Sequence, residues 1–395
     1  MNKLINSIFI TILISFSALS SEKELIALDI YQPKTKYDQN TIDEYYSCKN
    51  NSIIRYNENK YTLDTLKYFG TTIAIDIFDI PDKHAEKILC NALTVIQEYH
   101  YLASNYSTYP HVKNIKSINE APEKIHKIDF ELFELIAESI EWHKKSNGYF
   151  NIALSPVIDL WREKRSTCLK ANNSPESCSI PSDLALHQAA SFTQINDIVL
   201  NSKNHTIQMK KGMKIDLGGI AKGWMTEKVY DLLKKSGVKQ FMINAGGNIR
   251  HFGLHPEQRQ FVTAIEDPLC KKSEYQLTKC ATFEGMYHEV VSGIDITIVS
   301  SGNYLRFFEV NSKQYHHLID PHTNAPKPTG IATTVILTDQ QIYADVLSTM
   351  LFLMPLKEAI EFVDAHDYIE AVWYLNDDGK KVTSAHFNKH KLSVD

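Results

Sequence analysis

The sequence contains little glycine and no excess of basic residues. Only 15 of its 395 residues are glycine, and lysine and arginine (42) are outnumbered by aspartate and glutamate (47), for a net charge of −5. Such a balance argues against a broad nucleic-acid surface, which needs a basic excess. The chain also lacks internal repeats and long low-complexity tracts. Its 43% hydrophobic residues are sufficient for a full core, so we expect a globular protein.

Long apolar runs are absent except at the N-terminus, from Leu4 to Leu19. This run follows a lysine and precedes small residues, with a cleavage motif at Ala18-x-Ser20. It is typical of a secretory signal peptide and short for a membrane span, although an uncleaved anchor is the alternative. We therefore predict a signal peptide at 1–20 and a mature chain in the periplasm, free or associated with the inner membrane.

No cysteine pair has the C-x-x-C spacing of a zinc ribbon or a thioredoxin-type site. The six cysteines are Cys48, Cys90, Cys168, Cys178, Cys270 and Cys280. An even number in an exported protein predicts disulfides. Cys168–Cys178 and Cys270–Cys280 are predicted as local bonds, because each pair is ten residues apart in a polar segment. Cys48 and Cys90 are predicted to pair with each other, and a buried free thiol at Cys90 is the alternative.

The hydrophobic pattern changes at about residue 197. Before it, residues 21–60 are polar and predicted to be irregular, 71–79 have the pattern of a strand, and 84–104 and 130–148 have helical spacing. After it, short strands predominate. The predicted organisation is one domain over residues 61–395 behind the signal peptide and the irregular segment.

The short strands include 214–217 (KIDL), and helices are predicted at 220–235 and from residue 344. Residues 163–180 are predicted to form a surface loop, and 268–290 a polar insertion. Antiparallel strands beside separate helices indicate an α+β fold with mixed, largely antiparallel sheets and flanking helices.

The stretch IDLGGIAKGW (215–224) places Gly218 and Gly219 between a predicted strand and a predicted helix. Backbone N–H groups at such a junction can bind a phosphate. The stretch matches neither the P-loop nor the dinucleotide fingerprint. From these residues alone a tight structural turn is favoured over a nucleotide site.

Asp345 and Thr349 are four residues apart in a predicted helix, so they share one face. A carboxylate and a hydroxyl on one face suit Mg²⁺, which takes few protein carboxylates and keeps several waters. We accordingly expect Asp345 at a hydrated position. Spacing alone favours a structural alternative, in which Asp345 stabilises the helix N-terminus and Thr349 bonds its own helix.

Three histidines, His316, His317 and His322, lie near Asp320. Neighbouring residues in a strand point to opposite faces, so at most one of His316 and His317 is expected to face a given pocket. This pattern disfavours zinc and favours one working histidine.

The motifs, taken in order, resemble the ApbE family of FAD:protein FMN transferases over about residues 66–375. The quoted motifs are IDLGGIAKGW, INAGGNI (243–249), SSGNYLRFF (300–308), HHLIDPHTNAP (316–326) and ADVLSTML (344–351), with weaker matches at FGTT (69–72), YSTY (106–109) and GYFNIALSPVIDLW (148–161). The resemblance implies two lobes with a site for FAD and Mg²⁺ between them. It also implies transfer of FMN to a threonine or serine hydroxyl of a target protein, with release of AMP.

The resemblance also implies roles for individual residues. Metal ligands would be the side chains of Asp345 and Thr349 and the backbone carbonyls of Gly219 and Ile342. His317, or its neighbour His316, would act in catalysis. The residues expected to contact FAD are Phe69, Tyr109, Tyr149, Phe150, Asn151, Asp216 and Lys222.

The chain departs from the family pattern at two places. The family often has Phe-Asp-x-Thr where this chain has Phe150, Asn151, Ile152 and Ala153. Asn324 stands where the family usually has glycine, and asparagine tolerates the left-handed conformation that such a turn requires.

Three functions remain as hypotheses from the sequence. The first is an exported Mg²⁺-dependent transferase acting on membrane redox complexes of the Na⁺-translocating NADH:quinone reductase or Rnf type. The second is an FAD pyrophosphatase that gives FMN and AMP, and the third is a flavin-binding protein without catalysis. None of them involves nucleic acid.

Overall fold

The structure is a computed structural model that describes residues 47–174, 176–271, 280, 286–375 and 380–392. The predicted signal peptide and residues 21–46 of the predicted irregular segment lie outside the described residues, as does most of the predicted insertion 268–290. None of the helices in the described ranges is both long enough and apolar enough to cross a membrane.

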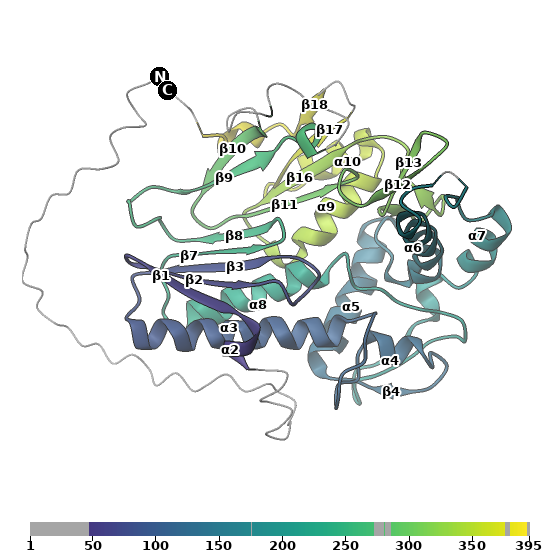
Figure 1. Cartoon of the computed structure of the whole chain (residues 1–395), viewed down its shortest axis with the longest axis horizontal. Helices are drawn as coiled ribbons and strands as arrows, with labels where there is room; N and C mark the ends of the chain where they lie inside the picture. The colour runs from purple at the N-terminus through teal and green to yellow at the C-terminus, as the bar shows by residue number, and fades with distance from the viewer. Residues whose placement is uncertain (1–46, 175, 272–279, 281–285, 376–379, 393–395) are drawn as a thin grey trace, which may run out of the picture. The chain divides into compact units, whose positions relative to one another are not determined.

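A nine-stranded sheet forms the centre of the fold, in the order β1-β2-β3-β7-β8-β11-β16-β17-β18 (Figure 1). Every neighbouring pair in it is antiparallel. The strands are β1 (Ile53–Asn57), β2 (Lys60–Thr65), β3 (Ile73–Phe78), β7 (Phe241–Ala245), β8 (Asn248–Phe252), β11 (Thr297–Gly302), β16 (Ala332–Leu337), β17 (Ile369–Tyr374) and β18 (Lys381–Thr383).

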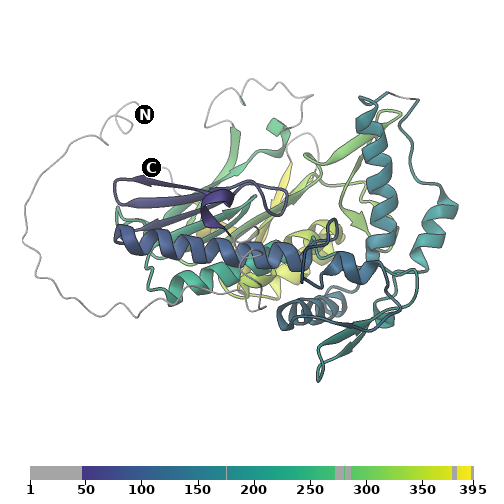
Figure 2. The same cartoon turned by 60° about the horizontal axis from the view of Figure 1, so that its bottom comes forward.

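Three helices pack on one face of this sheet (Figure 2). They are α3 (Asp82–Ala103), α8 (Ala221–Lys235) and α9 (Ala344–Leu353). Helix α3 contacts β2 and α8, α8 contacts β7 and β8, and α9 contacts β11 and β16. The helices predicted from apolar spacing at 84–104, at 220–235 and from residue 344 are thus confirmed, because the spacing that suggested them is the stripe that they bury.

A second layer covers the other face of the sheet around β11, β16 and β17. It consists of the hairpin β9 (Phe261–Glu266) and β10 (Tyr287–Gly293), with the short helix η7 (Phe387–His390). Ile265 and Val291 from the hairpin and Phe387 from η7 pack against Ile298 and Ile336 of the sheet. Because both faces are covered here, β16 and β17 are buried along their whole length, including Thr333 and Thr334 of β16 and Glu370 of β17.

The remaining elements form a helical part beside the sheet (Figure 1). A small core there combines Trp161, Cys168, Cys178, Phe308 and Ile319. Its helices are α4 (Ile115–Asn119), α5 (Phe130–Lys145), η1 (Ile152–Leu154), α6 (Ser155–Lys170), α7 (Asp183–Ala190) and η2 (Ile195–Asp197). Its strands are β4 (His126–Lys127), β5 (Val199–Asn201), β6 (Thr206–Gln208), β12 (Phe307–Val310), β13 (Lys313–His316), β14 (Ile319–Asp320) and β15 (Ala325–Pro326).

The other short elements are α2 (Cys48–Asn51), η3 (Pro268–Lys271), η6 (Gln341–Tyr343) and α10 (Leu356–Asp364). With α2 and β1, the described end of segment 21–60 is regular rather than irregular as predicted. The predicted domain boundary at residue 61 otherwise stays a prediction. The α+β fold class is confirmed.

Two local predictions are wrong. Residues 163–170 belong to helix α6 rather than to a surface loop, because Cys168 is fully buried in the helical core and holds this polar stretch in place. Residues 214–217 form no strand. This segment bonds instead to a side chain, since Asn119 both donates to the carbonyl of Ile215 (2.8 Å) and accepts from its N–H (2.9 Å).

All three predicted disulfides are confirmed: Cys48–Cys90, Cys168–Cys178 and Cys270–Cys280. The first ties α2 to α3 across 42 residues of sequence. It therefore anchors the segment that precedes the sheet. The alternative of a free thiol at Cys90 is wrong.

Candidate functional site

A cavity of about 380 Å³ lies where the end of the sheet meets the helical part. Most of the residues predicted for the site line it: Tyr149, Phe150, Asn151, Asp216, Gly219, Lys222, His316, His317, Asp345 and Thr349. Phe69, Tyr109 and Ile342 are not among its lining residues. The tertiary structure thus brings together predicted residues from four separate parts of the chain, 149–151, 216–222, 316–317 and 345–349.

Asp345 is the most buried acid of the cavity, with 4% of its surface exposed. Its Oδ1 accepts hydrogen bonds from Lys222 Nζ (2.9 Å) and Asn248 Nδ2 (3.2 Å), and its Oδ2 accepts one from the Gly223 N–H (2.7 Å). The expectation of a hydrated Asp345 is therefore wrong. The charge is compensated by a cation and two polar groups from α8 and β8, as a buried charge requires.

Gly223 permits the close approach of α8 to the start of α9. A Cβ at this position would lie 3.1 Å from the Ile342 carbonyl oxygen and 3.4 Å from the Asp345 nitrogen. Both are backbone atoms, which cannot move aside as a flexible side chain does. The glycine of the IAKGW motif is thus required by packing between two helices, and the carbonyl of Ile342 is held against α8.

The groups around Asp345 fit a hard divalent cation. Carboxylate, hydroxyl and carbonyl oxygens are the ligands that Mg²⁺ takes in proteins. Near the carboxylate, the Oδ1 of Asn248 is buried without a hydrogen-bond partner in the described residues, and Thr349 Oγ1 lies 3.3 Å from Ser301 Oγ. In the described ranges no group of three or more His, Cys, Asp or Glu residues is placed to hold a metal. A cation here would therefore depend on one carboxylate and neutral oxygens.

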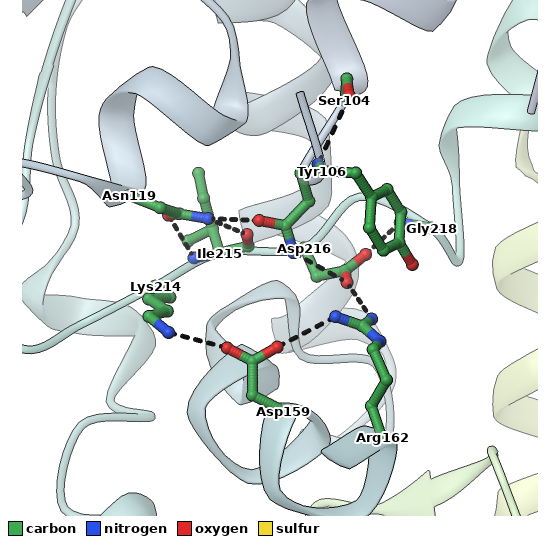
Figure 3. A network of polar contacts seen from close by, with 10 residues as sticks. Ser104, Tyr106, Asn119, Asp159, Arg162, Lys214, Ile215, Asp216 and Gly218 are labelled. Atoms are coloured by element: carbon green, nitrogen blue, oxygen red, sulfur yellow. Dashed lines mark hydrogen bonds and ion pairs between the residues drawn. The ribbon is translucent and has the colours of Figure 1, made fainter. Parts of the chain in front are cut away.

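Asp216 shapes the glycine turn that precedes α8 (Figure 3). Its Oδ1 accepts from the Gly218 N–H at 2.7 Å, which closes an Asx turn over two residues. Its Oδ2 accepts from Arg162 (2.9 Å) and Asn105 (3.2 Å). Because three donors already bond the carboxylate, Asp216 holds the turn in place next to Gly219 and Lys222.

A chain of charges continues from Asp216 along α6 (Figure 3). Arg162 also donates to Asp159 Oδ1 (2.9 Å), and Lys214 donates to Asp159 Oδ2 (2.8 Å). The guanidinium of Arg162 lies 5.2 Å from the centre of the Tyr106 ring, which also lines the cavity. The network thus ties the Asp216 carboxylate, and through it the glycine turn, to α6.

Two further arginines of the cavity, Arg165 and Arg306, have no acidic partner among the described residues. Burial lowers the pKa of the half-buried Arg165, and the charges of Arg306 and Arg162 lower it further. The acids of the cavity, Asp216 and Asp345, are already paired. This wall therefore has surplus positive charge, which favours an anionic ligand.

The two neighbouring histidines differ in their bonding. His316 is committed to the backbone: its Nε2 bonds the Lys327 carbonyl (2.8 Å) and its Nδ1 accepts from the Leu318 N–H (3.2 Å). His317 Nδ1 has no partner in the described part of the chain. Both residues line the cavity, contrary to expectation, because β13 ends at His316 and strand alternation does not continue to His317.

Burial is the main cause of the low pKa of both rings. The pKa of His316 falls to about 4, and that of His317 falls to about 3, where the charges of Arg306, His316 and Arg165 add to the effect. Both rings are consequently neutral at physiological pH. Of the two rings, His316 has both nitrogens bonded, and His317 has a buried Nδ1 without a partner in the described residues.

Phe69 and Tyr109 lie together outside the cavity lining, around His100. The Phe69 N–H donates to His100 Nδ1 (3.2 Å), and the Tyr109 hydroxyl bonds His100 Nε2 (3.2 Å). Tyr106, from the same YSTY motif, lines the cavity instead and is 71% exposed. Contact of Phe69 and Tyr109 with FAD stays a prediction, and Tyr106 is the tyrosine of this motif that lines the cavity.

Two departures from the family pattern have structural explanations. Asn151 caps η1 by accepting from the Ala153 N–H (2.9 Å) and donates to the Thr193 carbonyl (3.1 Å). Asn324 adopts a positive φ of 56°, as expected for a residue that replaces glycine in a turn.

Residues that sequence reasoning missed are Tyr106, Arg162, Arg165, Asn248 and Arg306. A signal existed for most of them, because Tyr106, Asn248 and Arg306 lie inside the recognised motifs. Arg162 and Arg165 directly follow the last motif residue of α6 and are three apart, hence on one helix face.

A model of the ApbE family matches residues 69–373. The FAD:protein FMN transferase of Treponema pallidum is 27% identical over 264 residues, which covers 63% of this chain and 67% of that protein. The enzyme of the same name from Haemophilus influenzae is 28% identical over 269 residues, covering 66% and 71%.

Solved structures show the same fold. The ApbE protein of Thermotoga maritima superposes with a TM-score of 0.69 at 22% identity, over 87% of this chain and 99% of that chain. The flavin transferase ApbE of Vibrio cholerae superposes with a TM-score of 0.67 at 22% identity, over 86% and 100%.

Replacing Asp345 by alanine is expected to lower the free energy of unfolding by roughly 3 kcal/mol or more, because it leaves the Lys222 ammonium and two polar groups without their acceptor. Urea denaturation measures the loss. The matched control is Glu361→Ala, which removes the acid of an exposed ion pair with Lys357 and is expected to cost at most about 1 kcal/mol. Equal losses in the two variants would contradict a buried, compensated Asp345.

The stability of the protein is expected to fall as the pH is lowered from about 6.5 towards 4. The pKa of His100, His251 and His316 is lowered to about 4 and that of His317 to about 3, from an ordinary value of 6.5. In this window the unfolded chain binds protons that the folded chain does not, so stability increases with pH. Urea denaturation at pH 7.5, 6.5 and 5.5 tests this prediction. In His317→Gln the free energy of unfolding should depend less steeply on pH. A free energy of unfolding that is constant down to pH 5 would refute it.

Proposed function

This chain belongs to the ApbE family, and from that membership we propose that it is an FAD:protein FMN transferase that uses Mg²⁺. It would transfer FMN from FAD to a threonine or serine hydroxyl of a target protein, forming a phosphoester and releasing AMP. The curated relatives from Treponema pallidum and Haemophilus influenzae carry this enzyme name.

The observation that carries the proposal is the combination of groups in one cavity. Oxygen donors at Asp345 and Thr349 lie in the same cavity as Arg165 and Arg306, which have no acidic partner among the described residues, and the aromatic ring of Tyr106. A flavin dinucleotide needs these three features, since its pyrophosphate is anionic and its ring system is flat and aromatic. A structural turn alone requires none of them.

Asp345, Thr349 and the carbonyls of Gly219 and Ile342 would hold Mg²⁺. When bound, the ion supplies positive charge that stabilises phosphoryl oxygens. In the structure Lys222 lies against Asp345, with 27% of its side chain exposed. Its ammonium is therefore close enough to the carboxylate to compete with a cation, and flexible enough to turn towards a phosphate.

His317 is the residue best placed to accept the proton of the acceptor hydroxyl. Its ring is neutral, and its Nδ1, which is buried, has no hydrogen-bond partner among the described residues, whereas both nitrogens of His316 are bonded. Burial is the main cause of its low pKa, and the neighbouring charges of Arg306 and Arg165 lower the pKa further. An anionic dinucleotide bound beside these arginines would offset their charge and raise the pKa towards the range of an effective base.

The alternatives use the same cavity. A pyrophosphatase would let water replace the protein hydroxyl and would give FMN and AMP, and a flavin-binding protein would hold FAD without releasing AMP. The unpaired cations and the oxygen donors favour a site for phosphate chemistry, and the family membership favours transfer.

We further propose that the protein acts in the periplasm, on subunits of Na⁺-translocating NADH:quinone reductase or Rnf-type complexes. Support comes from the three disulfides, which form and persist in oxidising compartments, and from the apolar N-terminal run. Fractionation of cells that express the full chain tests the location, and recovery of fully reduced protein from the cytosol would contradict it.

Mass spectrometry of an acceptor domain tests the function. The domain is incubated with the protein, FAD and Mg²⁺, with Mg²⁺ replaced by EDTA in a parallel sample, and AMP is measured in both. Transfer predicts an FMN adduct on a threonine or serine together with AMP. AMP without an adduct identifies a pyrophosphatase, and FAD binding without AMP identifies a binding protein.

Replacing Lys222 by methionine is expected to weaken FAD binding by about tenfold or more, because a charge-assisted bond to phosphate is lost. Asp345 keeps the Gly223 and Asn248 donors in this variant. Flavin fluorescence titration gives the affinity. The control is Lys228→Met on the same helix, whose ammonium lies over the Trp224 ring; an unchanged affinity in Lys222→Met would remove Lys222 from the FAD site.

A further inference from the structure

Arg250 is a fully buried charge that does not line the cavity. Its side chain is 1% exposed, on strand β8. The guanidinium lies 3.6 Å from the centre of the Tyr230 ring. Burying a charge costs free energy because its hydration is lost, so a buried guanidinium needs specific partners that compensate it.

The partners of Arg250 come from three different segments. Arg250 Nε donates to Glu227 of α8 (3.1 Å), and its Nη1 donates to Asp295, before β11 (2.5 Å). Its Nη2 donates to the Oε1 of Gln341 at 2.7 Å. The other end of Gln341, its Nε2, donates to the carbonyl of Asp295 (3.0 Å). Both ends of this amide are thus fixed.

Gln341 is the first residue of η6, which leads directly into α9. It is preceded by Gln340 in the left-handed conformation (φ 50°), a conformation that costs energy for a residue other than glycine. The next residue is Ile342, whose carbonyl oxygen faces Gly223 of α8. Asp345 follows in the first turn of α9. The amide of Gln341 therefore fixes the segment from which two proposed metal ligands extend.

We propose that Arg250 acts through Gln341 as a positioning pair for the metal-binding segment. The pair sets the Ile342 carbonyl and the Asp345 carboxylate at a fixed distance from Lys222 and Gly223. This inference rests on the proposed function, because it assumes that these groups bind Mg²⁺. An apolar core would also fill the space, but it would offer no directional bond to fix η6.

Glu227 and Asp295 neutralise the charge of Arg250 and also hold its guanidinium in one orientation, since each bonds a different nitrogen. Glu227 is on the same helix as Lys222 and Gly223, so Arg250 bonds both the helix that approaches Asp345 and the segment that carries it. Removing the bond to Gln341 is expected to leave the core folded and to free η6 alone. A general loss of stability would instead loosen α8 and η6 equally.

The test compares Gln341→Met with Tyr230→Phe. The first variant removes all three hydrogen bonds of the amide, to Arg250, to the Asp295 carbonyl and to the Leu337 carbonyl (3.5 Å), at similar size. The second removes the Tyr230 hydroxyl, which bonds Asp295 (3.0 and 3.1 Å) in the same network without touching η6. Isothermal titration with Mg²⁺ in the presence of FAD gives the metal affinity, and the Mg²⁺ dependence of FMN transfer separates KM for the metal from kcat.

Gln341→Met is expected to weaken Mg²⁺ binding about tenfold or more, to change kcat at saturating Mg²⁺ by less than about threefold, and to leave FAD binding without metal unchanged. Tyr230→Phe is expected to bind Mg²⁺ like the unaltered protein. Unchanged Mg²⁺ affinity in Gln341→Met, or an equal loss in Tyr230→Phe, would overturn the inference.

Amide hydrogen exchange over residues 341–345 tests the positioning role of Arg250 and Gln341 separately from the proposed function. If the unaltered protein neither binds Mg²⁺ nor transfers FMN, the proposed function is wrong. Exchange that is faster at Ile342 to Asp345 in Gln341→Met, but not in Tyr230→Phe, supports the positioning of the segment by itself. Equal exchange in both variants overturns it.

Discussion

The buried carboxylate of Asp345 is the point on which the site depends. It bonds Lys222 and Gly223 of α8 and Asn248 of β8, and so joins the start of α9 to the sheet and to the helix after the glycine turn. A single charge with 4% exposure tolerates only a narrow range of geometries, because each lost donor leaves part of the charge uncompensated. This arrangement also requires glycine at position 223, because α8 and the start of α9 approach so closely that a Cβ there would press against the Ile342 carbonyl oxygen.

The cavity beside this carboxylate is organised by where charge is paired and where it is not. Asp216 and Asp345 each accept hydrogen bonds from three neighbouring donors, which hold the backbone around them in place. Arg165 and Arg306 have no acidic partner in the described residues, and His317 beside them is neutral. The acids of the cavity, Asp216 and Asp345, therefore have their charges compensated. The wall with Arg165 and Arg306 has an excess of positive charge that a bound anion would balance. A bound anion would also raise the pKa of His317, which couples ligand binding to its basicity.

Much of the fold and part of the site could be predicted from the sequence. Apolar spacing located α3, α8 and α9, because a helix that packs on a sheet must present a continuous stripe. Cysteine spacing predicted Cys168–Cys178 and Cys270–Cys280, since closure over ten residues is a local event, and Cys48–Cys90 was predicted as the pair that remained. The motifs predicted that Lys222, Asp345, Thr349 and His317 would share a site. Residues 163–170 were assigned to a loop, because the buried contacts of Cys168 that hold them in a helix come from segments distant in sequence.

The sequence by itself determined the residue types at the site and the family, because the motifs are short and their chemistry is local. Only the tertiary structure decided how those residues are used. Burial turned Asp345 from an expected hydrated ligand into a compensated charge, and the end of β13 allowed both His316 and His317 to line one cavity. The turn after α3 placed Tyr106, rather than Tyr109, at the ligand space. Arg250 became relevant only through partners 23, 45 and 91 residues away in sequence. Burial, hydrogen-bond saturation and side-chain direction all depend on contacts between distant segments, and no local pattern records them.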